Sequence, residues 1–480
     1  MRKIYKYTFI LATAATLLFQ SCGKEYFDEL SANPNQVNVP TLPALLATVT
    51  SKAGLRTVDA GSAINSYVQY TANPTAGAAG DIYETIDFTG TWDGMYFAMA
   101  DINEMKKLAA GQSSEYLGVA NLLLAYHLSI VNNFWGAAPW SQAFDPSNFT
   151  PKYDTDQEVY AATVKLVDDA IAELAKTNAT IKLSAASDLI HKGDRAKWLM
   201  TAYAIKARLL IKASKTPAFN AAAVLSALSN SFKSNADDAG MSTFTLRNSW
   251  AQVSRNNASL SLGGWLSEQF IDHLNGNTYG VFDPRLPKIT DPAVSPSNAN
   301  YPKWIGTVNG AGNRNNPPHN NTVKDENYIS FNSPWTNDTA PILLVTYAEL
   351  KFIEAEAAFA TDKPRAYAAY LAGIRANMDK LQVAPSDRDA YLADPRVSVG
   401  AANLTLALIF KEKYVVTYLN PEAWNDARRH NYGYKDFGMP LNAVLPTFIR
   451  RLDYPIGERS KNGTNVPAGT LRTARLWWDL

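Results

Sequence analysis

The sequence predicts a mainly α-helical protein whose helices pack in pairs, with a loop-rich segment in the second half of the chain. Three observations support this prediction. Apolar residues recur at three- and four-residue spacing through most of the chain, helix-capping residues precede several of these stretches, and the periodicity stops between about 240 and 342. The chain has 480 residues, 46% hydrophobic and 19% charged, which is typical of a globular protein with a large core.

The first 21 residues have the pattern of a secretory signal. Three basic residues precede an apolar run from Thr8 to Phe19, which is shorter than the ~20 residues of a membrane-spanning helix. The run leads to Ser21 and Cys22, and a small residue directly before the only cysteine resembles a bacterial lipobox. We therefore expect a lipoprotein signal peptide over 1–21, lipidation of Cys22 and a tether over 22–40. The alternative is a simple secretory signal with a chance cysteine.

The first helical region extends from about 41 to 235. Apolar residues at helical spacing begin at Leu42 and continue through 92–109. Over 116–131 nearly all faces of the expected helix are apolar, which predicts a buried central helix. The capping box Thr155-x-x-Glu158 opens a helix to about 174. Asp194 can cap the next helix, and a short helix follows at about 219–232.

A second helical region follows at about 341–430. Thr346-x-x-Glu349 is another capping box, and Pro364 lies at the start of a helix that ends near 381. The last long helix covers about 404–419. These helices pair as in tetratricopeptide-like stacks, although no sequence repeat of about 34 residues is visible.

Between the two helical regions, the segment of about 240–340 is rich in Asn, Gly, Pro and Ser and carries scattered aromatic residues. Aromatic rings can cover the apolar face of a sugar, while amide and guanidinium groups satisfy its hydroxyls. We expect a ligand to bind to the Gly-rich loop 73–83 and to Trp304, Trp335, Tyr301, Trp92, Tyr279, Asn313 and Arg314. The alternative for each tryptophan is that it packs the loops onto the helices.

Composition and motifs exclude several classes of function. A net charge of +1 argues against a nucleic-acid-binding face, and a single cysteine excludes a disulfide or a Cys-rich zinc site. The chain has no His-Glu-x-x-His, Gly-x-Ser-x-Gly or phosphate-binding glycine-loop motif. We expect no catalytic residues, no cofactor and no metal. A structural calcium ion in the Asp- and Asn-rich loops stays an alternative.

Several short motifs, each weak alone, follow one another along the chain. They are Asn-Asn-Phe-Trp-Gly-Ala-Ala-Pro-Trp-Ser-Gln-Ala at 132–143, Gly-Asp-x-x-Lys-Trp at 193–198, Asp-Pro-Arg-Leu at 283–286, and Glu-Ala-Trp-Asn-Asp-x-Arg-Arg at 422–429. In this order they resemble the SusD/RagB family of nutrient-binding outer-membrane lipoproteins of Bacteroidetes. The chemistry of the last motif suggests a partly buried ion pair between Glu422 and Arg428 or Arg429.

The resemblance implies a right-handed α-α superhelix of tetratricopeptide-like pairs. The whole of 41–480 would be one SusD-like domain, with a helical scaffold at about 41–235 and 341–430, a ligand region at 240–340 and an irregular C-terminal region at 431–480. It also implies a non-catalytic, lipid-anchored protein of the cell outer membrane that binds an oligosaccharide or a peptide. The protein would deliver this nutrient to a SusC-like TonB-dependent transporter and act as its lid.

Two other functions stay open from the residues alone. One is a surface glycoside hydrolase on a helical scaffold, which requires two carboxylates flanking a cleft. The other is a structural helical adaptor that binds only the transporter.

Overall fold

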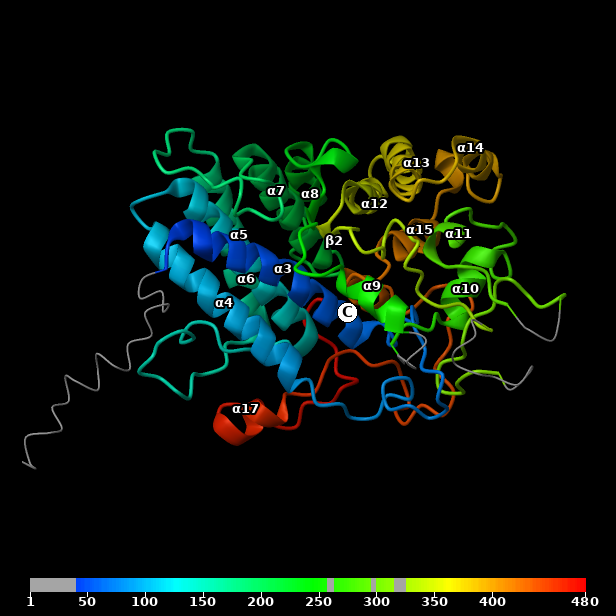
Figure 1. The fold of residues 1–480 in the computed structure, drawn as a ribbon, viewed down its shortest axis with the longest axis horizontal. Coiled ribbons are helices and arrows are strands. Elements are labelled where there is room, and N and C mark those ends of the chain that lie inside the picture. The colour runs from blue at the N-terminus through cyan, green and yellow to red at the C-terminus, as the bar shows by residue number, and fades with distance from the viewer. Residues whose placement is uncertain (1–39, 257–262, 295–298, 315–324) are drawn as a thin grey trace, which may run out of the picture. The chain divides into compact units, whose positions relative to one another are not determined.

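The computed structural model describes residues 40–256, 263–294, 299–314 and 325–480. The predicted signal peptide, lipidated Cys22 and most of the tether lie outside the described residues. Within them, Leu42–Leu480 form one unit with fifteen α-helices, two short 3-10 helices and two strands. The prediction of a mainly helical fold is confirmed (Figure 1).

Six helices form the first half of the scaffold, and each packs against the one that follows it. Their long antiparallel pairs agree with the predicted tetratricopeptide-like arrangement (Figure 1). They are α3 (Leu42–Ile64), α4 (Thr89–Ala109), α5 (Ser114–Trp135), α6 (Asp156–Leu174), α7 (Arg195–Lys212) and α8 (Ala221–Ser229).

The stack continues in the second half of the chain without a break in space. Helix α12 packs on α8, then α13 on α12 and α14 on α13, so the chain between α8 and α12 is inserted into a continuous row of helices (Figure 1). The helices of this half are α12 (Tyr347–Ala358), α13 (Lys363–Lys380), α14 (Pro385–Ala393), α15 (Leu406–Val416), α16 (Glu422–Arg429) and α17 (Ile456–Lys461). The 3-10 helices are Asn235–Asp237 and Ala401–Asn403.

The inserted segment is less irregular than the sequence suggests. Strand β1 (Ala239–Met241) pairs antiparallel with β2 (Ile342–Val345), which brings the two ends of the insertion together beside α3. Between them lie α9 (Ser249–Arg255), α10 (Glu268–Asn275) and α11 (Leu286–Ile289). The helical periodicity of the sequence stops in this segment because helices of eight residues or fewer are too short to show a clear 3.6-residue period.

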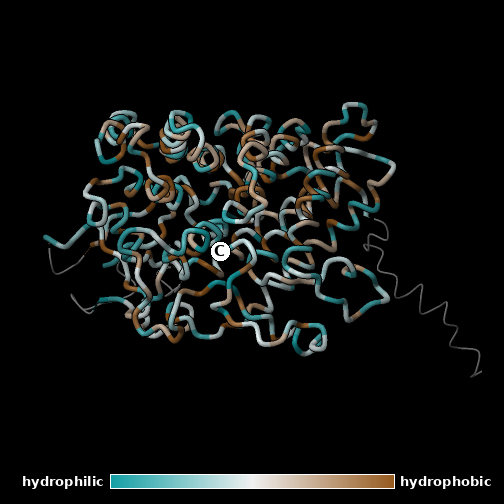
Figure 2. Tube along the Cα trace, turned by 180° about the vertical axis from the view of Figure 1, so that it is seen from behind, coloured by the Kyte–Doolittle hydropathy of each residue, from teal (hydrophilic) through white to brown (hydrophobic). Residues whose placement is uncertain are grey.

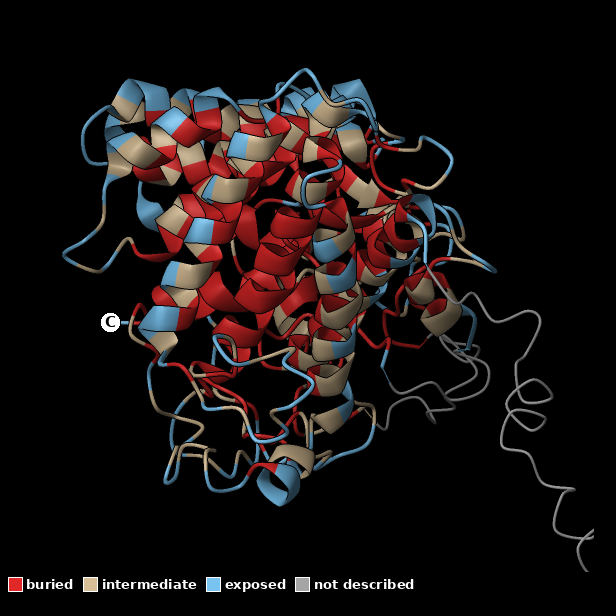
Figure 3. Ribbon diagram, turned by 90° about the vertical axis from the view of Figure 1, so that its left-hand side faces the viewer, coloured by how far each residue is buried: buried red, intermediate tan, exposed pale blue. Residues whose placement is uncertain are grey.

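Helix α5 is the centre of the core. Almost all of its residues are buried, including Leu122, Leu123 and Leu124, and α4 and α6 cover it from either side. Among the described residues it is the one helix long and apolar enough to span a membrane, but 89% of its most apolar window is buried inside the protein. Its apolar composition therefore reflects its central position. Figure 3 shows the buried interior and the exposed outer turns of the surrounding helices.

Helix caps and buried ion pairs agree with the sequence only in part. The reciprocal capping box of Thr155 and Glu158 is present, and Asp194 caps α7. At the second expected box, Thr346 accepts from the backbone of Glu349, but the Glu349 carboxylate accepts from Arg208 Nε at 2.7 Å instead of closing the box. The internal ion pair uses this carboxylate because a buried guanidinium needs a charged partner.

The predicted pairing of Glu422 with Arg428 or Arg429 is wrong. Arg429 instead forms ion pairs with Glu356 of α12 at 2.5 Å and with Asp426 at 2.7 Å. Arg428 donates to the carbonyl of Asn133 at 2.7 Å, and Glu422 lies 3.9 Å from Arg208. The arginines of the motif therefore join segments that are distant in sequence, in addition to the local pair of Arg429 with Asp426.

The C-terminal region 431–480 covers the ends of the first helices. Trp135 Nε1 donates to the carbonyl of Asp453 at 2.9 Å, and Arg472 donates to the carbonyl of Tyr83 at 2.6 Å. Trp478 is fully buried beside Lys212, whose pKa is lowered by burial to about 8. The red and blue loops that lie together in Figure 1 are joined by such contacts, and Figure 2 shows their mixed polar and apolar character.

Candidate ligand-binding site

A polar cavity of about 350 Å³ lies in the loop-rich part of the molecule. Its walls come from the start of the loop that follows α3, from the first turn of α10, from residues 308–309 and from residues 436–441. The described residues that line it include no lysine, arginine or histidine. Its polar lining side chains are Gln69, Ser267, Glu268, Gln269, Asp272, Asn277, Thr278, Asn309 and Asp436.

Hydrogen bonds between distant segments fix the walls of this cavity. Glu268 N donates to the carbonyl of Thr307 at 2.8 Å, and the buried Asn309 accepts from Ser267 Oγ at 2.6 Å. Asn309 Nδ2 also donates to the carbonyl of Thr71 at 3.0 Å. Gly310 is required here, because its φ is +84° and a Cβ would lie 1.9 Å from the carbonyl oxygen of Leu441. The cavity is therefore preformed rather than assembled by a ligand.

Two lining residues have backbone conformations that are unfavourable for L-amino acids. Gln69 has a φ of 51° and Asp436 a φ of 61°. Such conformations cost ~1–3 kcal/mol each and persist where surrounding contacts hold them, often at functional sites. Gln69 is held by its side chain, which donates to the carbonyl of Gly438 at 2.7 Å. The strain therefore lies at the cavity wall.

Three predicted site residues, Tyr301, Asn313 and Arg314, lie close to Glu326, and Arg314 also contacts a residue that lines the cavity. Arg314 forms ion pairs with the lining residue Glu268 and with Glu326, the latter at 3.2 Å. Asn313 Nδ2 donates to the same Glu326 at 3.0 Å. Tyr301 is half-buried nearby, and partial burial together with the charges of neighbouring carboxylates raises its pKa. Asn313 and Arg314 thus position the edge of the cavity through internal contacts.

Tyr279 and Trp304 are two half-buried aromatic residues of the loop region. The half-buried Tyr279 follows the lining residue Thr278, and burial raises the pKa of its hydroxyl to about 12. Trp304 is half-buried, with its ring 6.2 Å from that of Phe282, which is 44% exposed. Phe282 lines a more apolar hollow of about 470 Å³ beside α14. Both aromatic rings are partly accessible.

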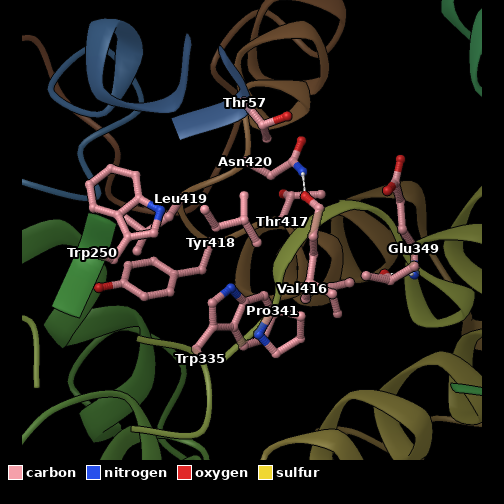
Figure 4. A pocket seen from close by; sticks show the side chains of 13 residues that line it. Thr57, Trp250, Trp335, Pro341, Glu349, Val416, Thr417, Tyr418, Leu419 and Asn420 are labelled. Carbon is pink, nitrogen blue, oxygen red and sulfur yellow. Dashed lines mark hydrogen bonds between the residues drawn. The ribbon is translucent and has the colours of Figure 1, made fainter. Parts of the chain in front are cut away.

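Trp335 and Trp92 serve as packing residues. Trp335 lines a void of about 20 Å³ together with Trp250 and Tyr418 (Figure 4). A void of that size holds one water molecule and no sugar. Trp92 is 2% exposed, and its ring lies 5.0 Å from that of Trp135 in the core. The expectation that Trp92 contacts a ligand is therefore incorrect for this structure, and Trp335 fits the packing alternative.

The polar lining of the cavity was not identified from the sequence. Gln69, Glu268 and Asp272 carry no motif, and they become neighbours only because the loop after α3 meets α10. The two consecutive glycines at 263–264 gave the best available signal, since Gly264 allows close contact with Tyr328 just before α10. Among the described residues, no three acidic, histidine or cysteine side chains are arranged to hold a metal ion.

Comparison with known proteins identifies similar sequences and folds. A sequence profile of the SusD-like family described as "Starch-binding associating with outer membrane" matches residues 34–455. A solved SusD/RagB family protein from Bacteroides thetaiotaomicron is 22% identical, with coverage of 92% of this chain and 99% of that chain and a TM-score of 0.75. A chitin-binding SusD homologue from Flavobacterium johnsoniae is 20% identical, with coverage of 92% and 98% and a TM-score of 0.75.

A SusD homologue from Bacteroides fragilis has the same TM-score of 0.75 at 21% identity, with coverage of 92% of this chain and 99% of that chain. At these identities the structural similarity establishes the fold alone. No curated protein matches this chain significantly in sequence.

Proposed function

Because the chain belongs to the SusD-like family of starch-binding proteins that associate with the outer membrane, we propose that it binds an oligosaccharide at the cell surface and delivers it to a SusC-like TonB-dependent transporter. The family match over residues 34–455 is the observation that carries this proposal. Lipidation of Cys22 would anchor the protein to the outer membrane, since buried acyl chains contribute ~0.8 kcal/mol per CH₂. Closure of the protein as a lid would then commit the ligand to import.

The chemistry of the loop region supports a glycan as the ligand. The polar cavity of about 350 Å³ falls in the ~300–1,000 Å³ range of small-molecule sites. Its carboxylate and amide groups can accept hydrogen bonds from sugar hydroxyls, and it lacks a basic side chain among the described lining residues. Tyr279, Tyr301 and Trp304 are partly exposed aromatic residues of the same loop region. Two similar structures are described as chitin-binding, which makes chitin fragments the first ligands to test.

Binding of this kind breaks no covalent bond. The sugar hydroxyls would donate to the carboxylates of Glu268 and Asp272, while an aromatic ring covers the C–H face of the sugar. Arg314 would hold Glu268 in place through their ion pair. The protein would then contribute selection and transfer, and no chemical step.

The test is a titration of residues 23–480, produced without the lipid, with chitotriose, maltotriose and short peptides. Binding would be followed by calorimetry and tryptophan fluorescence. Trp304→Ala and Tyr301→Ala should each weaken glycan binding by ~1–3 kcal/mol if the ring is a main contact. Phe149→Ala is the control, because Phe149 is an 86% exposed aromatic residue outside the loop region. A chain that binds peptides and no glycan would contradict the proposed ligand.

Hydrolysis is the second candidate function, and one observation favours it. Glu268, Asp272 and Asp436 line the same cavity, and glycoside hydrolases use two carboxylates. Incubation of the bound oligosaccharide with the protein should leave it intact if the protein only binds. New reducing ends that disappear in Glu268→Gln would instead establish a glycosidase.

A further inference from the structure

The last residues of the chain dock on the scaffold at the end of a connection that is not itself packed. From 463 to 475 every residue is described and none is buried, whereas Leu476, Trp478 and Asp479 are buried again. No helix or strand follows α17 in this described part of the chain. The segment 472–480, which we call the C-terminal strap, is therefore an extended arm whose end is packed.

The docked end of the C-terminal strap covers more positive than negative charge. The ring of Trp478 lies 4.8 Å from the guanidinium of Arg428 and 5.5 Å from Lys212 Nζ. Both carboxylate oxygens of Asp479 lie 2.7 Å from Arg450 Nη1. Arg428 bonds to carbonyl and amide oxygens and, among the described residues, to no carboxylate, and burial lowers its pKa to about 10. Docking of the strap therefore has an electrostatic cost, because buried charges without a partner are disfavoured.

The C-terminal strap also docks with incomplete hydrogen bonding. The indole N–H groups of Trp477 and Trp478 are buried without an acceptor among the described residues. The backbone of the strap is tied to the rest of the chain at Arg472, whose carbonyl accepts from Arg450 N at 2.7 Å, and at Trp477, whose N–H donates to Asp156 Oδ2 at 3.2 Å. Segments with few such ties and with unpaired buried donors open locally at a lower free energy than the core.

The first residue of the C-terminal strap holds the Gly-rich loop 73–83. Arg472 Nη1 donates to the carbonyl of Tyr83 at 2.6 Å. Tyr83 has a φ of 61°, and a backbone in this conformation persists only where surrounding contacts hold it. The same loop reaches the surroundings of the polar cavity, because Gly77 N donates to the carbonyl of Gly310 at 3.0 Å. Arg472 is therefore placed to fix the conformation of this loop.

We propose that the C-terminal strap is a latch with a docked and an open state. In the docked state, Trp478 and Asp479 keep Arg472 against Tyr83, which fixes the Gly-rich loop beside the polar cavity. In the open state, Arg472 leaves Tyr83 and the loop loses its fixed conformation, while the helices of the scaffold stay folded. Arg472 is thus a positioning residue, and the affinity for a glycan depends on the state of the latch. This last consequence rests on the proposed function, whereas the latch itself does not.

The test compares two variants of the C-terminal strap with a matched control. Asp479→Asn removes the carboxylate that binds Arg450, so it should open the latch. Arg472→Met removes the link between the strap and Tyr83 and leaves the docked end in place. Asp283→Asn is the control, because Asp283 is likewise buried and paired with an arginine, but in the inserted segment.

The first measurement is hydrogen–deuterium exchange of the lipid-free chain 23–480, followed in peptides from 73–83, from 472–480 and from α5. Asp479→Asn should speed exchange at least tenfold in both 73–83 and 472–480. Arg472→Met should do so in 73–83 alone, and the control in neither segment. Helix α5 should exchange as in the wild type in all three variants.

Two results of this measurement would overturn the latch. Faster exchange of 472–480 in Asp479→Asn with no change in 73–83 would show that the strap does not hold the loop. Equally faster exchange of α5 would show that the strap opens only when the whole fold opens.

The second measurement is a titration of the same variants with chitotriose and maltotriose. The affinity should fall at least tenfold in Asp479→Asn and in Arg472→Met and stay unchanged in Asp283→Asn. Wild-type affinity in both strap variants would overturn the dependence of binding on the latch. Failure of the wild-type protein to bind either glycan would overturn the proposed function, while the exchange data would still decide whether the latch exists.

Discussion

Replacement of Asp81 by asparagine should make the protein more stable at neutral pH. Burial raises the pKa of the Asp81 carboxyl to about 6 from an ordinary value of 3.8. The folded protein therefore holds this proton more tightly than the unfolded chain does. For a carboxyl shifted in this direction, stability falls as the pH rises from about 4 to about 6, and the loss is complete above that range. Asparagine keeps an acceptor for Asn73 N and Gly310 N but does not ionise.

The magnitude follows from the size of the shift. A change from 3.8 to about 6 corresponds to about 3 kcal/mol at ~1.36 kcal/mol per pKa unit. The entropy of unfolding is ~2.1 cal/mol/K per residue, so the 439 residues from Leu42 to Leu480 give about 0.9 kcal/mol/K. Asp81→Asn should therefore raise the melting temperature by about 3 °C at pH 7.5 and by little at pH 4.5.

The assay is a series of thermal melts of both proteins between pH 4.5 and 8. Asp154→Asn is the control of opposite sign. Partial burial raises the pKa of Asp154, but hydrogen bonds from Ser141 outweigh this effect and hold the pKa below its usual value. The Asp154→Asn substitution should therefore destabilise the protein most at neutral pH. An increase in melting temperature from Asp81→Asn that does not change with pH would refute the argument from burial. A decrease in melting temperature that grows with pH would refute it as well.

Three further substitutions test the scaffold. Arg429→Met should cost ~3–5 kcal/mol, because it leaves the buried carboxylate of Glu356 without its cation and leaves Asp426 with Lys413 alone, and the melting temperature should fall by several degrees. Thr155→Ala removes a reciprocal capping box and should cost ~1 kcal/mol in the same measurement, with Thr155→Ser as the variant that restores it. Gly61→Ala should cost ~1–3 kcal/mol, because the added Cβ would lie 2.4 Å from the carbonyl oxygen of Leu419, and an unchanged melting temperature would show that the backbone adjusts.

Local signals in the sequence were sufficient for the long helices. Thr155 and Asp194 mark helix starts because their side chains satisfy backbone N–H groups within three residues, which a sequence displays directly. The central position of α5 follows from its apolar composition. By contrast, the partner of Arg429 on α12 is 73 residues away, and nothing near the arginine in sequence indicates it.

The candidate site was less predictable, because burial of a side chain depends on tertiary packing. Trp92 and Trp304 are the same residue type, yet one lies in the core and the other at the surface of a loop. Gln69 follows the end of α3 and carries no motif that indicates a place in a cavity wall. Its position in the wall of the polar cavity becomes visible only when the loop after α3 meets α10.

During synthesis, the loop that follows α3 leaves the ribosome long before the residues that cover it. Arg472, which donates to the carbonyl of Tyr83, follows that residue by 389 positions, and at ~5–20 residues per second this interval lasts about 20 to 80 s. Throughout that time the nascent chain cannot complete this part of the fold. The loop that follows α3 therefore stays without this contact during most of the synthesis of the chain.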